Sequence, residues 1–299
     1  MIEWERMDGL IVADKPAGWT SHDVVNRMRR LANTKKVGHL GTLDPDATGV
    51  LPLVIGRATR LAQYFQRTDK VYEAVVHFGW STDSYDAAGA ATSPETEVTL
   101  DRDRMELELA SFRGKISQVP PAVSAKKIGG TPAYRLARQN IAVEMKPVNV
   151  EIYSLEILDC NGADLTIRVH SSTGTYIRSI AHDLGQTLGC GAFLSRLRRS
   201  SAGGFDISMA RTLDQLAALA EAGNLAEALI PCAELLPEFP SELVDDSTAG
   251  FIRQGRDFRV SPFRLEPDAK FVKAVSYEGD LVAIGEAVLP HLYHPVLVL

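Results

Sequence analysis

The chain has 299 residues, with 32 Lys and Arg against 38 Asp and Glu, and its formal net charge is −6. Hydrophobic residues make up 45% and charged residues 23%, values of ordinary globular proteins that exclude a disordered, collagen-like or coiled-coil chain. No apolar run approaches the ~20 residues that span a bilayer, and no signal-peptide pattern is present, so we expect a cytoplasmic protein with no membrane contact. Three widely spaced cysteines, Cys160, Cys190 and Cys232, predict neither a disulfide framework nor a zinc site.

Charge is distributed unevenly along the chain. Residues 1–70, 111–150 and 160–211 carry net charges of +3, +6 and +3, whereas residues 71–110 carry −7. A single basic segment is typical of solvated surface, but a fold can gather three of them on one face. We expect these basic segments to mark the surface for an anionic partner, and the acidic excess of 71–110 to lie away from the functional residues.

The first half of the chain shows clear element signals. Residues 9–13 predict a buried strand, and Thr20 with Asp23 forms a capping-box pattern that predicts a helix to about Ala32. Residues 38–52 are rich in Gly and Pro and predict a loop. Alternating apolar residues predict a strand over 70–80, and a helix is expected over 101–112.

The second half mixes strands and helices without a βαβ rhythm. A short helix is expected at 133–139, paired strands at 148–158 and 164–170, and a helix whose apolar stripe runs from Ile177 to Leu188. Prolines 231, 237 and 240 indicate a linker, followed by a short helix near 246–254 and several strands. The class that this pattern predicts is α+β.

The segment from Gly38 to Pro52, GHLGTLDPDATGVLP, is the strongest candidate for chemistry. Asp44 precedes Pro45, which biases the aspartate toward extended or turn backbone on a loop, where catalytic groups concentrate. On composition alone, however, Asp-Pro is a common turn. Asp44 and Asp46 together do not define a glycosidase pair, because two positions on a loop fix no carboxylate separation.

This segment resembles the signature of the TruB-type tRNA pseudouridine synthases nearly residue for residue. Further segments that resemble motifs of the family follow in the family's order and extend the resemblance over about residues 8–211. They are Lys15 to Ser21, Asp69 to Tyr72, Ser172 to Arg178 and Leu197 to Arg199. Val123 and Ser200 depart from the family pattern.

The resemblance implies a mainly antiparallel catalytic domain over residues 1–238 and a small PUA-like RNA-binding β domain over 239–299. A basic insertion at about 120–147 would clasp the RNA. The implied reaction is isomerisation of uridine 55 in the T loop of tRNA to pseudouridine. The family uses no cofactor and no metal, and we expect a monomer that needs no protein partner.

The resemblance also implies roles for individual residues. Asp44 would be the catalytic carboxylate, and the residues expected to bind or position the substrate are His39, Tyr72, Tyr176, Arg178, Lys15 and Lys127. Tyr72 would stack on the flipped base and His39 would fill the space that the base leaves. Arg178 would pair with the aspartate, and Lys15 would support its loop.

Two alternative functions remain open at this point. The chain could be an RNA-guided member of the same family, although the basic insertion favours an enzyme that recognises its loop directly. It could also be a tRNA-binding or chaperone module without catalysis, against which the combination of Asp44, Tyr72 and Arg178 argues.

Overall fold

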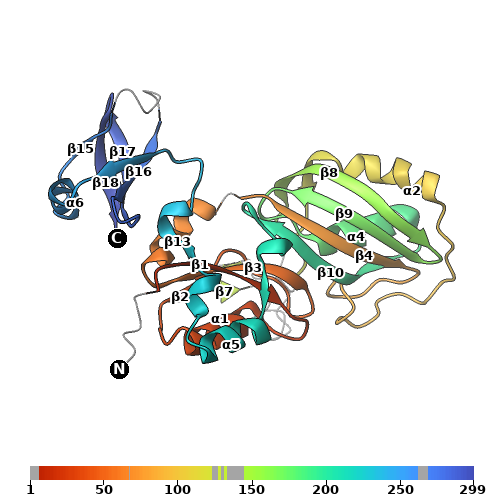
Figure 1. Ribbon diagram of the computed structural model, residues 1–299. Coiled ribbons are helices and arrows are strands. Elements are labelled where there is room, and N and C mark those ends of the chain that lie inside the picture. Colours follow the sequence, from red (N-terminus) through yellow and green to blue (C-terminus); the bar gives the residue numbers. More distant parts are fainter. Residues whose placement is uncertain (1–6, 67, 123–126, 129–130, 133–144, 262–268) are drawn as a thin grey trace.

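The computed structural model describes residues 7–66, 68–122, 127–128, 131–132, 145–261 and 269–299 (Figure 1). These residues form one large mixed sheet and a smaller second sheet near the C-terminal end, with helices packed on both. The predicted α+β class with a mainly antiparallel sheet is confirmed. The expected helix at 133–139 lies outside the described residues.

The large sheet has the strand order β12-β1-β3-β10-β4-β9-β8-β5. Its strands are β1 (Gly9–Lys15), β3 (Thr48–Ile55), β4 (Lys70–Phe78), β5 (Gly114–Gln118), β8 (Val148–Asn161), β9 (Asp164–Ser171), β10 (Ala192–Ala202) and β12 (Arg211–Thr212). Short strands β2 (Val37–His39), β11 (Phe205–Asp206) and β13 (Ile230–Pro231) pair alongside β3, β10 and β1. The β3–β10 and β1–β12 pairs are parallel, and the other pairs are antiparallel. Separately, β6 (Lys127–Ile128) pairs antiparallel with β7 (Thr131–Pro132).

Helices bury the two halves of this sheet in separate cores. Helix α4 (Ile177–Leu188) packs its apolar stripe on β4, β9 and β10, and α2 (Arg102–Leu109) packs at the edge of the same core. Helices α1 (Ser21–Leu31) and α5 (Leu213–Glu221) cover β1 and β3 (Figure 1). The predicted capping box is present, since Thr20 accepts from the Asp23 N–H and Asp23 accepts from the Thr20 N–H. The expected helices and strands over 9–32, 70–80, 101–112 and 148–188 are confirmed to within a few residues.

The expected loop over 38–52 is only partly correct. Irregular backbone is limited to residues 40–47, because β2 extends to His39 and β3 begins at Thr48. The run from Gly49 to Ile55 is buried, and Pro52 lies within the strand, where its carbonyl accepts from the Leu40 N–H at 3.0 Å. Burial of this apolar run outweighs the preference of Gly and Pro for loops.

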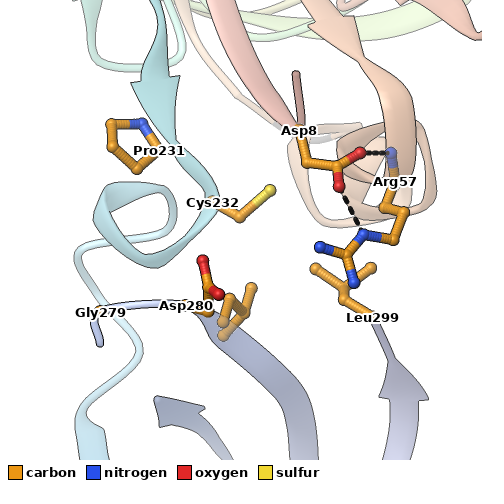
Figure 2. A pocket seen from close by; sticks show the side chains of 8 residues that line it. Asp8, Arg57, Pro231, Cys232, Gly279, Asp280 and Leu299 are labelled. Carbon is orange, nitrogen blue, oxygen red and sulfur yellow. Dashed lines mark hydrogen bonds and ion pairs between the residues drawn. The ribbon is translucent and has the colours of Figure 1, made fainter. Parts of the chain in front are cut away.

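The second sheet has the order β14-β16-β17-β18-β15. Its elements are β14 (Ser241–Val244), α6 (Asp246–Arg253), β15 (Phe258–Arg259), β16 (Phe271–Ser276), β17 (Leu281–Leu289) and β18 (Leu292–Val298). The helix and strands expected here are confirmed. An apolar cluster joins this sheet to the large one, and the buried Lys273 donates to the carbonyls of Ala233 and Leu235 in the linker. A small pocket between the two parts is lined by the Asp8–Arg57 ion pair on one side and by Asp280 and Leu299 on the other (Figure 2).

Within the described ranges, the structure contains no helix with the length and apolarity needed to cross a membrane.

Candidate active site

Three adjacent strands place the motif residues side by side at the centre of the large sheet. Arg199 on β10 lies opposite Gly49 on β3, and on its other side it lies opposite Tyr72 on β4. The loop 40–47, which carries Asp44, enters the sheet at β3. Residues separated by more than a hundred positions in the chain are therefore brought to one end of the β3–β10 pair.

Two buried side chains hold the Asp44 loop from the side of β1 and α1. Lys15 is completely buried, and its Nζ donates to the carbonyls of Pro45 (2.7 Å), Trp19 (2.5 Å) and Pro16 (2.9 Å). Ser21 Oγ accepts from the Leu43 N–H at 2.9 Å and donates to the Leu43 carbonyl at 3.1 Å. The residues on both sides of Asp44 are thus fixed, which limits the positions open to its carboxylate.

Arg199 holds the same loop from the opposite side. Its guanidinium is completely buried and donates to three carbonyls, those of Val50 (Nε, 2.8 Å), Gly41 (Nη2, 3.0 Å) and Thr42 (Nη1, 3.4 Å). A buried guanidinium is stable only where its donors are satisfied. The charge of Arg199 is therefore used inside the protein.

Arg178 contacts two carboxylates from the second position of α4. Its Nε lies 3.0 Å from Asp44 Oδ2 and its Nη2 donates to Asp44 Oδ1 at 3.2 Å, a two-point contact. Its Nη1 donates to Asp86 Oδ2 and to the Ser84 carbonyl, both at 3.2 Å. Asp86 is itself fixed, because its Oδ1 accepts from Ser84 Oγ and from the Ala88 N–H. The Arg178 side chain is only 6% exposed, whereas that of Asp44 is 42% exposed.

The surroundings of Asp44 act on its charge in opposite directions. Burial is the largest effect and raises the pKa of the Asp44 carboxyl above its ordinary value, and Asp86 and Asp46 raise it further. The Arg178 guanidinium and Lys15 lower the pKa and oppose that rise. Burial also lowers the pKa of Lys15 to about 8. The arrangement keeps a carboxylate partly out of water beside a guanidinium, a setting typical of catalytic carboxylates.

Tyr72 and His39 lie on the strands that flank this centre. The Tyr72 side chain is 7% exposed and belongs to the core cluster that includes Leu43 and Ala47, the neighbours of Asp44 on its loop. His39 ends β2 and is half-buried. Burial, Arg199 and His22 lower the pKa of His39, against a hydrogen bond to the Gly41 backbone that raises it. Its ring therefore favours the neutral form.

Tyr176 immediately precedes α4 and is fixed through its backbone. The amide of the buried Gln118 accepts from the Tyr176 N–H at 2.8 Å and donates to the Tyr176 carbonyl at 2.9 Å. This contact ties the end of β5 to the start of the helix that carries Arg178. Lys127 lies on β6, and its side chain is outside the described part of the structure.

The expectation about the acidic segment 71–110 is wrong for one residue. Asp86 lies within this segment and contacts Arg178, so part of the acidic excess belongs to the site. The pattern TDSYDAAG around Asp86 contains turn residues but no signal for an ion-pair partner. Ser21, Gln118 and Arg199 also act here without having been predicted. For Arg199 the signal available was its place in the late basic motif, although arginine is rarely fully buried.

The basic segments are likewise not purely surface. Lys15, Arg178 and Arg199 are all buried, so three of the positive charges counted in these segments act inside the protein. Within the described residues, no three His, Cys, Asp or Glu side chains gather as metal ligands would. The chemically distinctive feature is one partly exposed carboxylate, positioned by its loop and paired with a buried guanidinium. Such a group can act as a nucleophile or as a general base.

Comparisons with known proteins identify the family of this chain. Residues 29–177 match the TruB family pseudouridylate synthase N-terminal domain, and residues 178–237 match the tRNA pseudouridylate synthase B C-terminal domain. A tRNA pseudouridine synthase B of Solibacter usitatus is 60% identical over 293 residues, covering 98% of this chain and 100% of the relative. The enzyme of the same name from Dechloromonas aromatica is 42% identical over 95% of this chain and 92% of the relative.

Among solved structures, a chain from an H/ACA RNP bound to a substrate RNA containing 2'-deoxyuridine is similar to this chain. It matches with a TM-score of 0.73 and 26% identity, covering 100% of this chain and 87% of that one. The family models and the curated relatives cover most of the chain, and they show that the chain belongs to the TruB family of tRNA pseudouridine synthases.

Proposed function

We propose that this protein converts uridine 55 in the T loop of tRNA to pseudouridine and that Asp44 is the catalytic carboxylate. The single observation that carries the assignment of Asp44 is its two-point contact with the buried Arg178, on a loop held by Lys15, Ser21 and Arg199. The family membership supports the reaction, and the near-complete signature around Asp44 supports the target uridine.

The reaction has a simple atomic balance. The bond from N1 of the base to C1′ of the ribose breaks, the base rotates, and a bond from C5 to C1′ forms. The C5 proton passes to solvent and N1 gains a proton. The ionised Asp44 serves either by attacking the ribose or the base, or by removing the ribose C2′ proton.

The remaining residues then have positioning or binding roles. Arg178 stabilises the ionised form of Asp44, which burial disfavours. Lys15 is completely buried, so it acts on the substrate only through the loop that it supports. The Tyr72 ring supplies a stacking surface for the base, His39 fills the gap in the RNA stack, and Tyr176 and Lys127 contact the RNA.

Release of tritium from C5 of uridine tests this proposal. Purified protein is incubated with an unmodified tRNA transcript that carries tritium at every uridine C5. We expect tritium to be released from one uridine per tRNA. We expect no tritium release from a transcript that has cytidine in place of uridine 55. Absence of release from the first transcript would favour the non-catalytic tRNA-binding alternative. Release only after addition of a guide RNA would favour the RNA-guided alternative.

We further propose that the protein acts on tRNA as a cytoplasmic monomer without a protein partner. The division at residues 238 and 239 and the RNA-binding role of the PUA-like C-terminal part also stay predictions. The same transcript assay, run with the full chain and with a chain that ends at residue 238, tests the role of the C-terminal part. The molar mass of the active protein in solution tests whether it is a monomer.

A further inference from the structure

Tyr85 and His182 form a ring stack directly beside the Asp86–Arg178 contact. The two ring centroids are 3.7 Å apart and the planes differ by 12°, so the rings lie face to face. Tyr85 stands between Ser84 and Asp86 in the chain, and both of those neighbours accept hydrogen bonds from Arg178. The stack therefore adjoins the contact that fixes Arg178.

Helix α4 supplies both contacts from one face. Arg178 and His182 are four residues apart on α4, a spacing that places side chains one above the other on a helix. The segment 82–90, which we call the Asp86 loop, thus docks on α4 at two successive turns. Arg178 binds its polar groups, and His182 binds its aromatic ring.

The backbone at Tyr85 is held in an uncommon conformation. Its φ of +65° lies in the left-handed region, which bulky residues rarely adopt. On the side of β10, the Tyr85 carbonyl accepts from the Leu194 N–H at 2.9 Å, and the Ala87 N–H donates to the Leu194 carbonyl at 3.1 Å. Strain of this kind persists where the surroundings fix the residue, and it concentrates at functional sites.

The histidine is suited to packing rather than to hydrogen bonding at this place. Its Nδ1 is buried and has no hydrogen-bond partner within the described residues, and burial lowers the pKa of His182. Burial also raises the pKa of the Tyr85 hydroxyl, with a further contribution from Asp183. Both rings are therefore neutral near pH 7, and they meet as a neutral stacked pair.

We infer that Tyr85 and His182 are positioning residues for the proposed isomerisation, because their stack sets the Asp86 loop against Arg178 and thereby sets the guanidinium that holds Asp44. This inference rests on the proposed function. It assigns no contact with the substrate to either ring, and it requires the aromatic ring at position 85 rather than the tyrosine hydroxyl.

Single-turnover tritium release and tRNA binding by the full chain test the inference. We expect Tyr85→Ala to lower the rate constant about 10-fold to 100-fold, the range expected for a small displacement of catalytic groups, with the Kd for tRNA unchanged. Tyr85→Phe keeps the ring and is expected to restore the rate to within about twofold of the unmodified protein. His182→Ala removes the other ring and is expected to give the same loss as Tyr85→Ala.

A matched control and a double variant separate positioning from general destabilisation. Tyr153 is also a tyrosine in ring contact with a histidine, His170, but it is 52% exposed on β8, so Tyr153→Ala is expected to leave the rate unchanged. Combining Tyr85→Ala with Asp86→Asn is expected to be no slower than the slower of the two single variants, because both changes act through one contact.

Several results would overturn the inference. These are an unchanged rate in Tyr85→Ala, an equal loss in Tyr85→Phe, or a loss that multiplies with that of Asp86→Asn. Thermal melting identifies a variant that fails to fold, and His182→Ala then carries the test from the helix side. If the unmodified protein releases no tritium, the proposed function fails. If the unmodified protein releases tritium and Tyr85→Ala releases it at the same rate, only this inference fails.

Discussion

Arg178 contacts Asp44 at two points, with 3.0 Å between Nε and Oδ2 and 3.2 Å between Nη2 and Oδ1. The Asp44 side chain is 42% exposed, whereas the Arg178 side chain is only 6% exposed. The positive charge thus approaches from the interior, and the open side of the carboxylate is left for a substrate. Asp86 shares the same guanidinium at 3.2 Å. The protonation state of Asp44 therefore depends on a second carboxylate, that of Asp86, which lies 42 positions later in the sequence.

The pH dependence of the reaction follows from this sharing. Asp44 must be ionised to react, and burial with Asp86 raises its pKa above 3.8, so the rate is expected to fall as the pH drops through that raised pKa. Asp86→Asn removes one negative charge, so that the Arg178 guanidinium no longer shares its charge between Asp44 and Asp86. The midpoint of the acid limb is therefore expected to move to lower pH, as measured by single-turnover tritium release against pH.

Asp103 on α2 provides the control for this measurement, since it is an exposed aspartate outside the Arg178 contacts. Asp103→Asn is expected to leave the midpoint in place. A midpoint that moves upward in Asp86→Asn would show that Asp86 acts on Asp44 by some means other than its charge.

Ser21 fixes the residue directly before Asp44. Ser21→Ala leaves the buried Leu43 N–H without its partner, and we expect the free energy of unfolding to fall by about 1–3 kcal/mol. Because the loop is then less well held, the single-turnover rate constant is expected to fall about 10-fold to 100-fold. Urea denaturation and tritium release measure the two effects, with the exposed Ser117→Ala as control. A stability loss with no change in rate would separate the loop anchor from catalysis.

Gly49 lies against the backbone of Arg199. A Cβ at Gly49 would come within 2.2 Å of the Arg199 carbonyl oxygen, and its φ is +103°. Gly49→Ala is therefore expected to lower the free energy of unfolding by about 2–4 kcal/mol, from backbone strain together with overpacking. Gly162→Ala has a φ of +58° with no atom within 4 Å of the new Cβ, and we expect it to cost only about 1 kcal/mol. Equal losses in the two variants, in urea denaturation, would rule out the close approach.

The basic insertion is expected to bind RNA phosphates. Changing Lys126 and Lys127 together to Ala should weaken tRNA binding and make the slope of log K against log salt shallower by about 1–2. Arg102→Ala with Arg104→Ala removes the same number of charges from α2 and serves as the control. An unchanged slope in the lysine variant, measured by filter binding over a salt series, would mean that the insertion is not a contact surface.

Local sequence signals predicted the elements that depend on neighbours in the chain. The capping box at Thr20 and Asp23, the alternation along β4 and the apolar stripe of α4 each formed as expected, because burial of one face decides them. The motif around Asp44 likewise identified the loop that carries the paired carboxylate.

Contacts that depend on distant pairing could not be predicted in the same way. Leu194 on β10 pairs with the Asp86 loop and helps to hold Asp86 beside Arg178, and nothing in residues 82–90 indicates that pairing. Arg199 would be expected at the surface, and it is buried because the carbonyls of Gly41, Thr42 and Val50 converge on it. Such interactions arise from the sheet order, which the sequence pattern left open.

The role of Asp44 is tested most directly by single-turnover tritium release from tRNA by Asp44→Asn, with Asp46→Asn as the matched control on the same loop. We expect Asp44→Asn to bind tRNA with an unchanged Kd and to lose at least about 100-fold in rate. A loss of about 100-fold is the lower end of the range that a general base contributes. Asp46 is exposed, and Asp46→Asn is expected to retain the rate of the unmodified protein. Release by Asp44→Asn at the unmodified rate would contradict the assignment of Asp44 as the catalytic carboxylate.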